Sequence, residues 1–198
     1  MIVISNQAHL QALGIAASFA VALPDAVCTQ KTRVPYVLCL HDYGQNADRL
    51  LRMLACDALV DTQNIGLLIP DGQNSCFLDM AYGPHWESYL MNELLPYAQR
   101  TFPLQNTPRV FGVGTGGWAA ARLAAAYPDR FAASAAANAR PDLPALYAQG
   151  KLSDRPDLEA AFGDPQRLQE YPVNKNTVWL EGANALQVLY NNDWSTPA

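Results

Sequence analysis

Residues 109–123 read RVFGVGTGGWAAARL, which is a short β-branched and aromatic run, a glycine-rich turn and the start of an alanine-rich helical segment. A strand, a tight turn and a helix in direct succession form the setting of the G-x-S-x-G motif, which holds a serine on a strained turn above a parallel sheet. Here residues 112–116 read GVGTG, so Gly114 stands where the serine belongs. Glycine relieves the steric cost of such a turn but has no hydroxyl. The stretch predicts the frame of a nucleophilic site without its nucleophile.

The composition is typical of a soluble globular protein. The 198 residues are 50% hydrophobic and 16% charged, which predicts a single domain over residues 1–198. The net charge of −5 argues against a nucleic-acid partner. The four cysteines lack metal-ligand spacing and predict buried thiols in a reducing, cytoplasmic compartment. We expect no metal and no cofactor.

One apolar stretch, residues 13–23, lies near the N-terminus. No Lys or Arg precedes it, and larger apolar residues alternate with smaller ones along it. A signal peptide needs a basic flank, whereas alternation is the period of a β-strand. We therefore interpret the stretch as a strand rather than a targeting segment. No run of the sequence reaches transmembrane length, and we expect no membrane partner.

Apolar runs and helical spacings alternate along the chain. Strands are predicted at 1–5, 13–23, 35–40, 65–70, 109–113, 131–137 and 177–181, and helices at 48–62, at 86–100 and after the turn at Gly114. The first two strands predict an antiparallel edge, and the unbroken apolar runs predict buried parallel strands. Asn46 or Asp48 is expected to cap the first helix. Residues 71–84 form a long loop, and 141–169 a helical insertion interrupted by prolines. The pattern predicts an α/β fold with a mostly parallel central sheet.

Six stretches, in order along the chain, carry a resemblance to a known family. They are 36–44 (YVLCLHDYG), 67–72 (LLIPDG), 79–84 (DMAYGP), 93–96 (ELLP), 127–133 (YPDRFAA) and 162–165 (FGDP). Over about residues 13–185 the chain resembles the tributyrin esterase and esterase D (S-formylglutathione hydrolase) family of α/β-hydrolases. The resemblance implies an α/β-hydrolase fold with helices on both faces of the sheet. It also implies that the chain is shortened at its C-terminal end relative to the family.

The same resemblance implies a Ser–Asp–His triad in that chain order, and this chain departs from it at each member. Gly114 replaces the serine, Ala185 is the best match for the aspartate, and Asn192 is a possible match for the histidine. All three histidines of the chain precede residue 86. A hydroxyl nucleophile needs a positioned base, which in turn needs an orienting group. The departures predict that the triad is lost.

The loop at 41–44 resembles the H-G-x-G oxyanion loop of the family, with Asp42 in place of the glycine. A carboxylate there would repel negative charge that develops on a substrate. The residues expected to form the oxyanion loop and pocket are His41, Asp42, Tyr43, Thr115, Tyr82 and His85. We expect a cavity between the turn at Gly114, the 42–43 loop and the 71–84 loop, because all three leave carboxyl ends of strands.

Each candidate side chain also has a structural interpretation, which we favour. Thr115 is expected to cap its own helical turn, His41 to be a hydrogen-bonded loop histidine, and His85 to be an exposed surface residue. The alternative for His85 is contact with a ligand. Cys39 and Cys76 are alternative nucleophiles, but each lacks a histidine partner late in the chain.

Three functional hypotheses follow. The leading one is a non-catalytic homologue that binds a small acyl or ester-like ligand or a protein partner. The second is a carboxylesterase or thioesterase that uses unconventional residues such as His85, Thr115 or Asp42. The third is a decayed gene product without a selected activity. The sequence leaves the first and third open.

The end of the chain carries an expectation about association. A strand at 177–181 would lie at the edge of the sheet, with its apolar surface only partly shielded by Val188, Leu189 and Trp194. Exposed apolar surface beside an open edge favours self-association. We expect a homo-oligomer, or a hetero-oligomer with an active relative, joined near residues 177–194.

Overall fold

The computed structural model describes residues 1–29, 32–54, 56–140, 143–150, 155, 157–164 and 186–190. These residues form a sheet in the strand order β1-β2-β4-β3-β5-β6-β7. The strands are β1 (Ile2–His9), β2 (Ala16–Leu23), β3 (Tyr36–Leu40), β4 (Gly66–Pro70), β5 (Arg109–Val113), β6 (Ala133–Ala137) and β7 (Leu186–Tyr190). The pairs β1–β2 and β2–β4 are antiparallel and the other pairs are parallel. The predicted α/β fold with an antiparallel edge and a mostly parallel sheet is confirmed.

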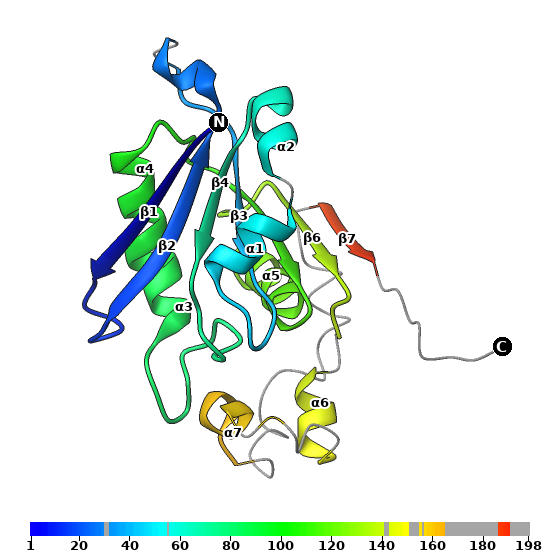
Figure 1. The fold of residues 1–198 in the computed structure, drawn as a ribbon. Coiled ribbons are helices and arrows are strands. Elements are labelled where there is room, and N and C mark those ends of the chain that lie inside the picture. The colour runs from blue at the N-terminus through cyan, green and yellow to red at the C-terminus, as the bar shows by residue number, and fades with distance from the viewer. Residues whose placement is uncertain are drawn as a thin grey trace, which may run out of the picture.

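Helices connect the strands and lie on both faces of the sheet (Figure 1). They are α1 (Ala47–Met53), α2 (Cys56–Gln63), α3 (Trp86–Ser88), a π-helical segment at Tyr89–Leu94, α4 (Leu95–Thr101), α5 (Thr115–Ala126), α6 (Leu143–Ala148) and α7 (Asp157–Phe162). The single helix predicted at 48–62 is wrong, because α1 ends at Met53 and α2 is a separate helix. The Asn46 side chain caps α1 by accepting a hydrogen bond from the Arg49 N–H at 2.9 Å.

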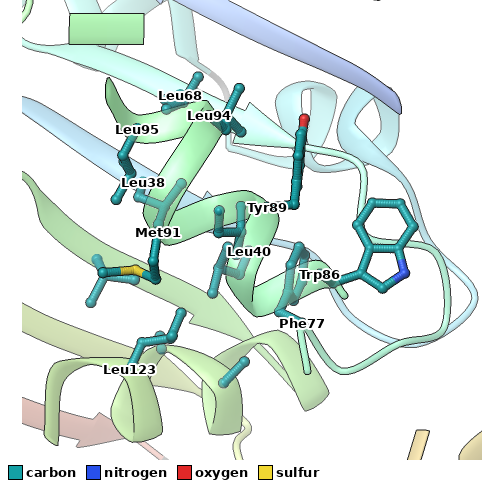
Figure 2. Packing of buried hydrophobic residues seen from close by; sticks show 14 of the residues in the cluster. Leu38, Leu40, Leu68, Phe77, Trp86, Tyr89, Met91, Leu94, Leu95 and Leu123 are labelled. Atoms are coloured by element: carbon teal, nitrogen blue, oxygen red, sulfur yellow. The ribbon is translucent and has the colours of Figure 1, made fainter. Parts of the chain in front are cut away.

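Successive side chains along a strand point to opposite faces of the sheet, and a hydrophobic core lies on each face. On β3, Leu38 and Leu40 belong to the larger cluster, which also takes in buried residues of α4 and α5. Figure 2 shows these leucines beside Met91 and Leu123, which come from the helical layer on that face. Cys39 points to the smaller cluster, formed with α1 and α2 on the opposite face. A strand that feeds both cores has to be apolar at every position, which explains the unbroken run at 36–40.

The last strand lies where the sequence predicts only a tail. Residues 186–190 form β7, which pairs in parallel with β6 from Ala133↔Leu186 to Ala137↔Tyr190. Val188 and Leu189 are therefore strand residues, and the expectation that they belong to a tail is wrong. The strand predicted at 177–181 and Trp194 lie outside the described residues. Association near residues 177–194 stays a prediction.

The cysteines and the helices bear on the expectations about compartment and membrane. Cys39, Cys56 and Cys76 are buried, whereas Cys28 is exposed, so the prediction of burial is wrong for Cys28. Within the part of the chain that the structure describes, no helix is long and apolar enough to cross a membrane.

Candidate functional site

The turn between β5 and α5 is a sharp elbow built on three glycines. Gly114 has φ +56° and ψ −119°, a left-handed conformation that favours glycine. Its N–H donates to the carbonyl of Ala137 at 2.9 Å, which ties the elbow to β6. A Cβ on Gly112 would lie 2.1 Å from the Gly116 oxygen, and a Cβ on Gly116 would lie 2.3 Å from the His41 oxygen. The glycines therefore let the start of α5 pack directly against β5 and the end of β3.

The Asp42 carboxylate lies across this elbow. Its Oδ1 accepts hydrogen bonds from the backbone N–H of Tyr43 at 2.7 Å and of Thr115 at 2.8 Å. In α/β-hydrolases an oxyanion hole is made by the N–H of the residue after the nucleophile and an N–H from the loop after the third strand. Thr115 and Tyr43 occupy these two positions here. The chain thus places its own anion where the oxyanion of a substrate would have to bind.

Asp42 also occupies the space of a side chain at position 114. A Cβ built on Gly114 would lie 2.0 Å from Oδ1, 2.1 Å from Cγ and 2.3 Å from Oδ2 of Asp42. Atoms cannot approach this closely, so the carboxylate in this position requires glycine at 114. The two departures from the family pattern are therefore sterically coupled.

The Thr115 hydroxyl also forms a hydrogen bond with the Asp42 carboxylate. Its Oγ1 donates to Asp42 Oδ1 at 3.2 Å, and no described side-chain bond caps α5. The prediction that Thr115 caps its own turn is wrong, because the acceptor comes from a loop 73 residues earlier in the chain. Among the described residues, the acceptor of this hydroxyl is thus a carboxylate and not the histidine of a Ser–His or Thr–His pair.

His41 anchors the loop that carries Asp42. The ring is 1% exposed, and Nδ1 lies 2.8 Å from the carbonyl oxygen of Asp42. The Gly72 N–H donates to Nε2 at 2.9 Å, which assigns the proton to Nδ1, where it is donated to that carbonyl. Both nitrogens are thus used inside the protein, so His41 has no nitrogen left to act as a base at the elbow.

We expect His41→Ala to destabilise the protein by about 3 kcal/mol, because it leaves the Asp42 carbonyl and the Gly72 N–H unpaired in a buried site. Urea unfolding followed by circular dichroism measures the loss. His9→Ala, in β1 and away from the loop at His41, is the control. It should change stability by less than about 0.5 kcal/mol. An equally small effect for His41→Ala would contradict the anchoring role.

Two other candidates lie away from the elbow. Tyr82 is 65% exposed, and the His85 side chain is 63% exposed with Nδ1 3.8 Å from Asp79 Oδ2. The loop that carries them is bound to α7 through the N–H groups of Ala81 and Tyr82, at 3.1 and 2.9 Å from carbonyls of that helix. Neither residue belongs to the lining of the cavity beside the elbow, and the favoured interpretation of His85 as an exposed surface residue is confirmed.

Cys39 and Cys76, the two thiols considered as alternative nucleophiles, are both buried. Burial raises the pKa of Cys76 to about 12 and raises the pKa of Cys39 as well. The thiolate is the reactive form of cysteine, and a raised pKa keeps both groups protonated near neutral pH. The described residues also contain no group of three or more His, Cys, Asp or Glu side chains that could hold a metal ion.

A cavity of about 240 Å³ opens beside the elbow. Its lining residues are Asp42, Gly114, Thr115, Asn138, Arg140, Leu143, Leu146 and Arg155. The predicted cavity at Gly114 and Asp42 is present, but its third wall is the segment after β6 and not the 71–84 loop. Sequence reasoning missed both arginines. Arg140 follows the carboxyl end of β6, and ligands bind at the carboxyl ends of strands in such sheets. This position in the sequence could have identified Arg140 as a cavity residue.

Ala185 and Asn192, the positions matched to the acid and the base of the triad, lie outside the described residues. The sequence shows that neither position holds a triad residue and that no histidine follows His85.

A mostly parallel sheet with a glycine elbow between β5 and α5, and with a loop N–H facing the first N–H of that helix, defines an α/β-hydrolase. The family profile described as "Putative esterase" matches residues 11–193. The chain belongs to this esterase family. A comparison with curated proteins found no match.

The solved structures that match this chain include several hydrolases. The chain is similar to FphF, a fluorophosphonate-binding serine hydrolase of Staphylococcus aureus, with 18% identity over 96% of this chain and 89% of that one and a TM-score of 0.76. It is also similar to the S-formylglutathione hydrolase FrmB of the same organism, with 19% identity over 95% and 78% of the two chains and a TM-score of 0.77. An S-formylglutathione hydrolase of Agrobacterium tumefaciens has 15% identity over 97% and 87% and a TM-score of 0.74. At these identities the likeness shows the fold alone.

Proposed function

We propose that this chain is a non-catalytic member of the esterase family that binds a small acyl compound in the cavity beside Gly114. The observation that carries the proposal is the Asp42 carboxylate, which accepts hydrogen bonds from the Tyr43 and Thr115 N–H groups. An oxyanion hole acts by stabilising the negative charge that develops on the substrate oxygen. A hole already filled by a carboxylate opposes that charge.

The missing nucleophile and base support the same conclusion. Covalent hydrolysis needs a nucleophile, a base and an orienting group acting as one unit, and loss of the serine alone costs on the order of 10⁶ in turnover in subtilisin. Gly114 has no hydroxyl, His41 is fully engaged, and the sequence has no later histidine than His85. The cavity nevertheless keeps its place at the carboxyl ends of the strands. Arg140 and Arg155 in its lining suit a ligand that carries a carboxylate.

We expect no covalent adduct when the purified protein is treated with a fluorophosphonate and analysed by intact mass. We also expect no burst of product with a short-chain p-nitrophenyl ester, because no acyl-enzyme forms. An active serine esterase run in parallel shows that the reagents work. Adduct formation or a burst would overturn the proposal in favour of an unconventional esterase. The variants Thr115→Val and His85→Gln would then show which side chain reacts.

The binding half of the proposal is measured with hexanoate as the probe. A ligand that binds only the folded state raises the unfolding temperature as its concentration increases. We expect hexanoate to stabilise the wild type in this way. Failure of hexanoate and of every related compound to bind would remove the ligand from the proposed function.

A further inference from the structure

The cavity beside the elbow has a negative floor. Asp42 Oδ1 is held by two N–H groups and the Thr115 hydroxyl, but Oδ2 accepts no hydrogen bond from any residue that the structure describes. Because Asp42 lines the cavity, its carboxylate is available to a donor that enters there. A ligand that carried only a carboxylate would meet a like charge at this floor, which is unfavourable at short range.

Two cations line the same cavity. Arg140 and Arg155 line the cavity together with Asp42. Neither arginine forms an ion pair within the described ranges. The Arg155 guanidinium lies 5.0 Å from the centroid of the Tyr43 ring, an arrangement that holds it over the loop. The nearby Asp157 accepts instead from the Tyr43 hydroxyl at 3.2 Å and from the Asn74 amide at 2.6 Å. Both guanidinium groups can therefore receive a carboxylate from a ligand.

Two leucines add an apolar part to the otherwise polar lining, and the space is small. Leu143 and Leu146 of α6 are 2% and 8% exposed and contribute aliphatic surface. The volume of about 240 Å³ lies below the range of about 300–1,000 Å³ that is usual for pockets of drug-sized ligands. The cavity thus suits a compact molecule with a short hydrocarbon portion.

From these three features we propose that the cavity selects a small aliphatic zwitterion, a free amino acid or a compound of the same chemistry. Its ammonium group donates to Asp42 Oδ2, its carboxylate binds Arg140 and Arg155, and its hydrocarbon chain packs on Leu143 and Leu146. A zwitterion pairs both charged walls at once, whereas a plain carboxylate or amine leaves one wall unpaired. This inference rests on the proposed function, because it names the class of ligand that the non-catalytic cavity binds.

A matched series of six-carbon compounds tests the ligand class. It comprises norleucine, 3-aminohexanoate and 6-aminohexanoate, which separate the two charges by different lengths, together with hexanoate and hexylamine. Isothermal titration with the full-length protein measures each dissociation constant. We expect the best zwitterion to bind at least tenfold more tightly than both hexanoate and hexylamine. If hexanoate or hexylamine binds as tightly as the best zwitterion, the inference is wrong. The proposed function still stands in that case, provided that hexanoate binds.

Charge-removing variants assign the two ends of the ligand. Asp42→Asn retains an oxygen acceptor for the Tyr43 and Thr115 N–H groups, and we expect it to abolish the preference for the zwitterion over hexanoate. Arg140→Gln should weaken binding of every carboxylate at least fivefold without weakening hexylamine. Asp129→Asn and Arg52→Gln, both exposed and outside the cavity lining, are the matched controls and should leave all constants unchanged. Retention of the zwitterion preference in Asp42→Asn would overturn the assignment of the ammonium end.

Discussion

Gly116→Ala is expected to prevent folding or to reduce the free energy of unfolding by about 4 kcal/mol or more, which is at the extreme of single substitutions. The added Cβ would lie 2.3 Å from the His41 oxygen and 2.4 Å from the Leu40 oxygen. Both are backbone atoms at the end of β3, a central strand, so no side-chain rotation relieves the overlap. The first turn of α5 would have to move away from the sheet, and the elbow would open.

Soluble yield and urea unfolding of the variant measure this effect. Gly44→Ala, in the loop after β3, is the matched control. Gly44 has φ +69°, but nothing lies within 4 Å of an added Cβ, so only the backbone conformation is penalised. We expect that variant to lose about 1–2 kcal/mol. A Gly116→Ala protein as stable as the Gly44→Ala protein would contradict the close contact between α5 and β3.

The parallel strands could be predicted because burial on both faces leaves a local mark in the sequence. The unbroken apolar runs at 35–40 and 65–70 correspond to β3 and β4, which feed both cores. The glycine spacing at 112–116 likewise marks the elbow, because a strained turn and a close helix contact both require glycine there. These features depend on residues that are neighbours in the chain.

The contacts that define the candidate site are not local, and most of them could not be predicted. The bond between Asp42 and Thr115 joins residues 73 positions apart, and nothing near either residue indicates it. Tyr82 and His85 have suitable chemistry for a pocket, but their direction depends on the contact of their loop with α7. β7 did leave a signal, because Leu186, Val188 and Tyr190 alternate at strand period. The strand predicted at 177–181 lies outside the described residues and is not tested by β7.

The second large effect concerns the elbow position itself. Gly114→Ser should lower the free energy of unfolding by about 3 kcal/mol, from the cost of the left-handed conformation together with the hydrogen bonds that Asp42 loses when it moves aside. Asp42→Gly alone should cost about 1–2 kcal/mol, because the exposed N–H groups can bind water in the cavity. The double variant should lose about 2 kcal/mol less than the sum of the two single losses, because the overlap between the serine and Asp42 no longer exists.

Urea unfolding of the four proteins gives the coupling free energy, and a p-nitrophenyl ester assay of the same samples gives the turnover. The double variant carries a serine on the elbow and an unfilled oxyanion hole, yet we expect less than a tenfold rise over the wild type. A serine without a base stays protonated and gains little, since the members of a triad act as a unit. Additive stability losses would contradict the steric coupling of Asp42 and Gly114. Esterase-like turnover would place a histidine within reach of position 114, and His41→Ala and His85→Gln in the double-variant background would identify it.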